Sequence, residues 1–203
     1  MNEKNLLADV DVPTIEGNFS SMYMLQIALQ RRLQCLPMDT TNYKHMAAKC
    51  VYWGHCIRAE IEELNEWLFE KKDPTWLKEM QMEAIDIIHF VFNLAVEIGY
   101  TDLEIKLISD AYDHQEWEHE VQRVQAANAI LTSSVIKLID LLPWKTWKTY
   151  KEAPDANKVY IEYTNVFRAS LMLCNACGLS EQGIIDMYFA KNKVNHTRQD
   201  NGY

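Results

Sequence analysis

Residues 83–95 read EAIDIIHFVFNLA, an apolar run interrupted by single polar residues. Apolar residues fall on most faces of a helix here, so the run predicts a helix buried inside a bundle. By their 3 and 4 spacing, the residues on one stripe of this helix are Glu83, Asp86, Phe90, Asn93 and Glu97, with His89 beside the stripe. A buried carboxylate is costly unless it is paired or binds a metal, so Glu83 and Asp86 need a partner.

The rest of the chain has the same helical character. It has 6 glycines and 5 prolines among 203 residues, and no segment alternates as a strand does. We therefore predict an all-α fold, a helical bundle. The expected helices cover about 20–36, starting from a cap at Ser20 or Ser21, then 41–70, 74–98, 101–122, 124–142, 155–177, and a last helix from Ser180 almost to the end.

The composition narrows the class of protein. With 48% apolar and 24% charged residues, the chain suits one soluble domain over 1–203, with an irregular lead-in over 1–19. A net charge of −9 disfavours a nucleic-acid partner. The start of the chain does not have the pattern of a secretory signal, and no apolar run reaches the length of a membrane span. We therefore expect a cytoplasmic protein with no membrane partner.

A second pair of carboxylates lies upstream of the buried run. Glu60 and Glu63 are one helical turn apart and can point into the bundle beside Glu83 and Asp86. Four oxygen ligands of this kind suit Mg²⁺, which keeps several waters and binds substrate phosphates. Acidic pairs at this spacing are also common on solvated helix faces, so the Glu60 pair alone would be weak evidence.

The last expected helix carries a polar stripe that suits an anion. Its members are Tyr188, Lys191, Asn192, Asn195, Arg198 and Gln199. Arginine can grip a phosphate through two parallel hydrogen bonds, and lysine acts as a mobile point charge. A solvated C-terminal helix would often show a similar stripe.

Two further groups complete the candidate residues. Gln26 and Gln30 are one turn apart on the first helix, and amides can read a base edge, although such pairs usually lie on the surface. The Cys174-x-x-Cys177 spacing lacks a second pair for zinc, and its thiols are more simply explained as core residues. All five cysteines, Cys35 and Cys56 included, are expected to be reduced.

Taken together, these motifs resemble the dimeric all-α dUTPases, relatives of the MazG-type enzymes in the all-α NTP pyrophosphatase superfamily. The motifs are Glu60-x-x-Glu63, Glu83-x-x-Asp86-x-x-His89-Phe90 and the run from Tyr188 to Tyr203. Residues 25–33 and the ending at Tyr203 resemble the phage dCTP/dUTP pyrophosphatases of this superfamily. Gln30 stands where dimeric dUTPases commonly have asparagine, which leaves the choice between uracil and cytosine open.

The resemblance implies a homodimer that uses Mg²⁺ to hydrolyse dUTP, and possibly dCTP, to the nucleoside monophosphate and pyrophosphate. It implies metal ligands at Glu60, Glu63, Glu83 and Asp86. It implies catalytic roles for Glu60, Glu63, Lys191 and Arg198, with Glu60 or Glu63 activating the water. It implies substrate contacts at Gln26, Gln30, Trp53, His89, Phe90, Asn93, Tyr188, Lys191, Asn195 and Arg198.

Two alternatives stay open at this point. The enzyme could act on another nucleoside triphosphate, or the chain could be a helical interaction module without activity. In the second case the carboxylates and the C-terminal basic stripe would simply pair across the bundle. The loop around Trp144 and Trp147 could be either a closing lid or an interface patch.

Overall fold

The computed structural model of the chain describes residues 17–32, 43–69, 74–113, 120–145, 147–150 and 152–201. Within these ranges it has seven α-helices and no strand, so the all-α prediction is confirmed. The helices are α1 (Phe19–Arg32), α2 (Tyr43–Phe69), α3 (Trp76–Ile98), α4 (Asp102–Asp110), α5 (Val121–Leu141), α6 (Ala156–Ala176) and α7 (Glu181–Asp200). The predicted lead-in over 1–19, the end of the first predicted helix and Gly202-Tyr203 lie mostly or wholly outside the described residues.

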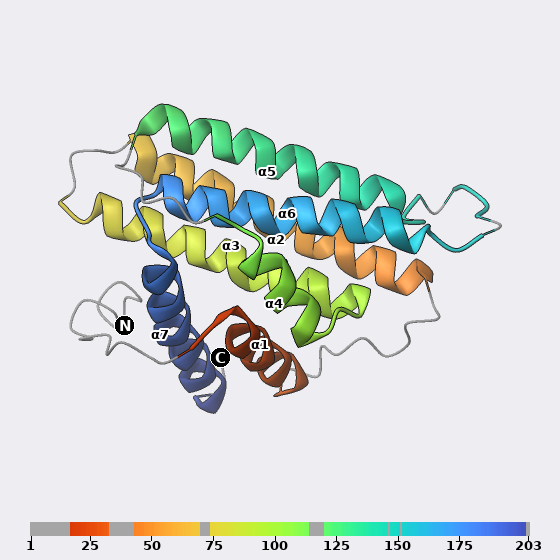
Figure 1. Cartoon of the computed structure of the whole chain (residues 1–203), viewed down its shortest axis with the longest axis horizontal. Coiled ribbons are helices and arrows are strands. Elements are labelled where there is room, and N and C mark those ends of the chain that lie inside the picture. The colour runs from red at the N-terminus through yellow and green to blue at the C-terminus, as the bar shows by residue number, and fades with distance from the viewer. Residues whose placement is uncertain are drawn as a thin grey trace.

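Four long helices, α2, α3, α5 and α6, form the central bundle. In it α2 packs against α3 and α5, and α6 packs against the same two helices (Figure 1). Helices α1 and α7 lie together below the bundle and both contact α3, while α4 packs on α1 and α6. Helix α3 therefore contacts both the bundle and the α1/α7 pair, and its polar stripe can be shared between them.

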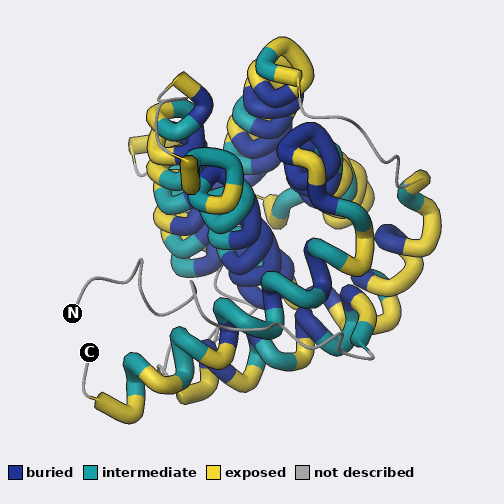
Figure 2. The backbone as a smooth tube through the Cα atoms, turned by 90° about the vertical axis from the view of Figure 1, so that its left-hand side faces the viewer, coloured by how far each residue is buried: buried dark blue, intermediate teal, exposed yellow. Residues whose placement is uncertain are grey.

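Helix α3 is the most deeply buried element, as its sequence predicts. Ile85, Ile88 and Phe92 have no exposed surface, and the polar residues His89 and Asn93 are buried beside them. The buried residues run through the middle of the molecule, with exposed residues on its outer helix faces (Figure 2). A polar side chain on this helix must therefore find its partners within the protein.

The helix ends follow local chemistry. Thr101 forms a capping box with Glu104, and the Ser180 hydroxyl accepts a hydrogen bond from the Gly183 amide, so both predicted caps are confirmed. Gly99 ends α3 with a φ of 89°, a conformation that favours glycine.

Two predicted boundaries need correction. Helix α1 starts at Phe19, and the Asn18 side chain, rather than Ser20 or Ser21, accepts from the backbone of its first turn. Helix α4 ends at Asp110 instead of continuing to about residue 122. It ends there because the Tyr112 amide donates back to the Ser109 carbonyl, which tightens the last turn, and the Tyr112 hydroxyl donates to Asn175 at 3.1 Å.

Helix α5 corrects the expectation that no run is long and apolar enough to cross a membrane. It is the one helix of the described part that passes this test by length and composition, with 39% of the relevant window buried. This is weak evidence for a membrane span, because the core helix of a soluble protein passes the same test. Its buried residues, such as Val124 and Leu131, pack in the bundle against α6 and α2.

Candidate functional site

Three carboxylates meet where α2 faces α3. Glu60 from α2 and Glu83 and Asp86 from α3 each offer one oxygen, and these oxygens lie within 4.8 Å of one another. All three residues are partly buried. Glu63, one turn from Glu60, is exposed and lies outside this group, although its charge acts on both Glu60 and Glu83. We call Glu60, Glu83 and Asp86 the carboxylate cluster.

Burial and mutual repulsion act on the acids of the carboxylate cluster. Burial and then the charge of Asp86 raise the pKa of Glu60 to about 8. Burial and then Asp86 also raise the pKa of Glu83 to about 7, although a hydrogen bond with Glu60 and the charge of Lys191 oppose the shift. A hydrogen bond between two carboxyl groups needs a proton, so the cluster holds a proton where a cation would fit.

One cation from α7 already reaches the cluster. The Lys191 ammonium donates to Asp86 Oδ2 at 2.6 Å, and both side chains are largely buried. Lys191 is therefore placed at the boundary between the carboxylate cluster and the polar face of α7.

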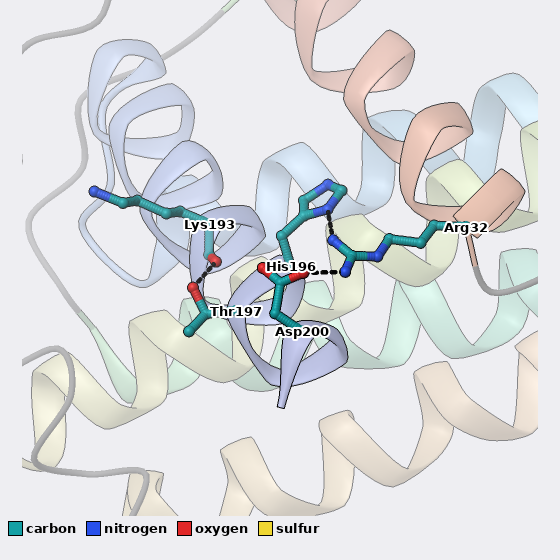
Figure 3. Close-up of polar contacts among 5 residues, drawn as sticks. All are labelled: Arg32, Lys193, His196, Thr197 and Asp200. Atoms are coloured by element: carbon teal, nitrogen blue, oxygen red, sulfur yellow. Dashed lines mark hydrogen bonds and ion pairs between the residues drawn. The ribbon is translucent and has the colours of Figure 1, made fainter. Parts of the chain in front are cut away.

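The polar face of α7 continues away from the cluster. Asn195 and Arg198 follow Lys191 at helical spacing and are half-buried. The end of α7 is tied to α1, because Arg32 donates to His196 Nδ1 at 3.4 Å and pairs with Asp200 (Figure 3).

A buried hydrogen-bond network lies further along α3, about two helical turns from Asp86. Gln26 donates to Asn93 Oδ1 at 2.6 Å, and Gln30 donates to the same oxygen. Gln26 Oε1 in turn accepts from the Tyr188 hydroxyl at 2.8 Å and contacts His89 Nδ1 at 2.8 Å. We call these five residues the amide network.

Several buried atoms in and beside the amide network have no partner. They are Gln30 Oε1, His89 Nε2 and, on α7, Asn192 Nδ2. Burial, followed by the nearby charge of Lys191, lowers the pKa of His89 to about 3, so its ring is neutral at physiological pH. A buried polar atom without a partner in the protein is commonly satisfied by water or by a ligand.

Aromatic rings flank the amide network. Trp53 of α2 stacks on Phe90 of α3 with ring centroids 5.9 Å apart, and His89 stacks on Tyr188 at 4.0 Å. The Trp53 indole donates to Glu97 at 3.3 Å, and Glu97 is buried with its second oxygen unpartnered.

The structure thus brings the predicted residues into two adjoining groups. The carboxylate cluster and Lys191 form one, and the amide network with Trp53 and Phe90 forms the other. Arg198 and Asn195 extend the first along α7, whereas Glu63 stays at its edge. The hydrogen bond from Trp53 to Glu97 was not predicted from the sequence, although Glu97 lies on the α3 stripe.

The chain was compared with known proteins. The sequence model of a family described as dUTPase matches residues 18–203, nearly the whole chain. No curated protein and no solved structure matches it.

Proposed function

The chain belongs to the dUTPase family and is a dUTP diphosphatase, and we propose that it is Mg²⁺-dependent and also accepts dCTP. The products would be the nucleoside monophosphate and pyrophosphate. The observation that carries the proposal is the carboxylate cluster facing Lys191.

The carboxylate cluster fits a divalent metal ion by its chemistry. It offers three hard oxygen ligands within 4.8 Å of one another, and burial together with the neighbouring carboxylates raises the pKa of Glu60 and of Glu83. Glu63 can add a fourth carboxylate from the next turn of α2. A bound Mg²⁺ would neutralise this charge and polarise the phosphates of the substrate.

Glu60 or Glu63 would orient the attacking water and accept its proton. The water oxygen would bond to the β-phosphorus. The bond from that phosphorus to the oxygen bridging it to the α-phosphorus would break, and this oxygen would leave with the nucleoside monophosphate. Glu60 is the better placed of the two, because it belongs to the carboxylate cluster and Glu63 is exposed.

Lys191, Asn195 and Arg198 would bind the triphosphate and stabilise the charge that develops on it. Lys191 holds Asp86 in the absence of a metal, and a metal ion at the cluster would free its ammonium for a phosphate. The ion pair is also what the interaction-module alternative predicts, but the family match over residues 18–203 supports a dUTP diphosphatase instead.

The base and sugar would lie against the second group of residues. Trp53 and Phe90 offer ring faces, and the amide network offers hydrogen-bonding atoms about two turns along α3 from Asp86. This separation suits a nucleotide whose phosphates lie at the carboxylate cluster.

We also propose a homodimer in the cytoplasm. Leu103 and Leu107 are one turn apart on α4 and are 60% and 55% exposed, which leaves an apolar stripe on the surface of the single chain. A second copy of the chain would cover such a stripe.

Pyrophosphate release from a panel of nucleoside triphosphates, with Mg²⁺ and with EDTA, tests the proposal. We expect turnover of dUTP and dCTP in Mg²⁺ and its loss in EDTA. Full activity in EDTA would contradict the metal dependence. A purine nucleotide as the best substrate would contradict the assignment of the base.

A further inference from the structure

The hydrogen bonds of the amide network fix the orientation of every amide in it. Because Asn93 Oδ1 accepts from both glutamines, Gln26 and Gln30 both turn their NH₂ groups toward Asn93. Gln26 must then turn its oxygen toward Tyr188 and His89, so His89 carries its proton on Nδ1. Gln30 Oε1 and His89 Nε2 are consequently both bare acceptors, and both are buried and unpartnered.

A second arrangement is available only if the whole network reverses. If Asn93 turned its NH₂ group toward the glutamines, both glutamines would have to turn their oxygens toward it. Gln26 would then donate to His89 Nδ1, and the His89 proton would move to Nε2. In this reversed state Gln30 presents an N–H donor where it presented an acceptor.

The two arrangements differ in stability. In the reversed state the Tyr188 hydroxyl accepts from Gln26 and no longer donates to it, so its proton loses that acceptor. All other contacts within the network are kept with donor and acceptor exchanged. The acceptor arrangement, which the structure shows, is therefore the preferred one.

We propose that Asn93 is a positioning residue. The orientation of its amide fixes which of the two arrangements the network adopts, and this sets the base selectivity. The acceptor arrangement pairs Gln30 Oε1 with the N3–H of uracil. The reversed arrangement pairs Gln30 Nε2–H with the bare N3 of cytosine. This inference rests on the proposed function, because it needs the base to lie against Gln30.

The chemistry of the two bases supports this assignment. They differ at N3, which carries a proton in uracil and none in cytosine, so one fixed amide cannot pair with both. A mispaired buried acceptor lowers affinity by about tenfold or more. A network that reverses as a unit accepts both bases, with uracil preferred.

Two isosteric variants should lock the network in opposite states. In Asn93→Asp the carboxylate can only accept, so both glutamines must donate to it and Gln30 keeps its acceptor outward. In Gln26→Glu the carboxylate accepts from Asn93 Nδ2, Asn93 must reverse, and Gln30 turns its N–H outward. We expect the ratio of kcat/KM for dCTP over dUTP to fall about tenfold or more in Asn93→Asp and to rise by a similar factor in Gln26→Glu.

Asn128→Asp is the matched control, because Asn128 is a buried asparagine bonded to Asn65 outside the network. Its ratio should stay at the wild-type value. Equal ratios in all three variants, or a shift in the same direction in Asn93→Asp and Gln26→Glu, would overturn the proposal.

A measurement on the wild-type protein covers the case in which a variant fails to fold. With ¹⁵N-labelled histidine, the His89 shifts should report a proton on Nδ1 with dUMP bound and on Nε2 with dCMP bound. The same tautomer with both nucleotides would overturn the proposal. If the wild type showed no metal-dependent turnover of dUTP, the proposed function would be contradicted instead. Failure of the base-selectivity proposal and failure of the proposed function are therefore distinguishable.

Discussion

The carboxyl groups of Glu60 and Glu83 lie together in a partly buried place and share a hydrogen bond. Their pKa values, about 8 and about 7, lie above those of an unfolded chain, so the folded protein binds more protons than the unfolded one. A group with a raised folded-state pKa contributes stability at low pH that is lost as the pH rises. In the metal-free protein this site therefore lowers the free energy of unfolding as the pH rises.

The first prediction concerns the thermal stability of the metal-free protein as a function of pH. As the pH rises from about 4.5 to about 8, the Tm of the metal-free protein should fall relative to a Glu60→Gln/Glu83→Gln variant, which lacks the two titrating groups. Added Mg²⁺ should raise the wild-type Tm at pH 8.5 and have little effect at pH 5, where the groups hold protons. Thermal unfolding followed by circular dichroism measures both. Parallel pH profiles for the two proteins would contradict the assignment.

The second prediction concerns the two lysines of α7. Lys191 reaches the carboxylate cluster, whereas Lys193 is exposed and its ammonium points away from the Arg32 contacts (Figure 3). Lys191→Met should lower kcat/KM for dUTP by about tenfold to a hundredfold, the worth of a hydrogen bond to a charged group. Lys193→Met is the matched control and should keep the wild-type value. Similar values in both variants would remove Lys191 from the reaction.

Three of the four predicted carboxylates, Glu60, Glu83 and Asp86, lie together, and Glu63 lies outside the cluster. The prediction has a physical basis: acids inside an apolar helical run must be compensated, and Glu83 and Asp86 were recognisable from that run alone. The amide network could be predicted from the sequence only in part. Gln26 and Gln30 were candidates, but the bonds that join Tyr188, His89 and Asn93 to Gln26 depend on how three helices pack.

The helices show why some elements were predictable and others were not. The starts of α4 and α7 carry side-chain caps that act within a single turn, at Thr101 and Ser180, so both are predictable from local sequence. The end of α4 depends instead on a tertiary contact between Tyr112 and Asn175, which no local pattern encodes.

The third prediction tests the cap of α7. Ser180→Ala removes the acceptor for the Gly183 amide, a bond of 3.1 Å, and should lower the free energy of unfolding by about 1 kcal/mol. Urea unfolding measures this change. The variant should keep its KM for dUTP, because Lys191 lies about three turns further along the helix. A large rise in KM would show that the start of α7 takes part in binding.

On the scale of the whole molecule, α3 joins the four-helix bundle to the α1/α7 pair. The proposed metal ligands lie in the bundle, and the proposed phosphate and base contacts come largely from the α1/α7 pair. A change in how α1 and α7 sit on α3 would therefore alter substrate binding while leaving the carboxylate cluster intact.

The fourth prediction concerns assembly. Sedimentation should give twice the chain mass of 23.8 kDa. Leu103→Glu/Leu107→Glu should shift the protein toward a monomer, because two charges would replace the exposed apolar stripe of α4. Lys137→Glu, a charge change at an exposed position of α5, away from α4, is the control. A monomeric wild type at high concentration would contradict the dimer, and an intact dimer in the double variant would place its interface elsewhere.

We propose that the carboxylate cluster holds the Mg²⁺ of this dUTP diphosphatase. Titration calorimetry with Mg²⁺, in the presence of non-hydrolysable α,β-imido-dUTP, compares the Mg²⁺ affinity of the wild type with that of Glu83→Gln. We expect the Mg²⁺ affinity to be at least about tenfold weaker in Glu83→Gln, with an unchanged helical spectrum. Equal affinity in the two proteins would contradict the claim.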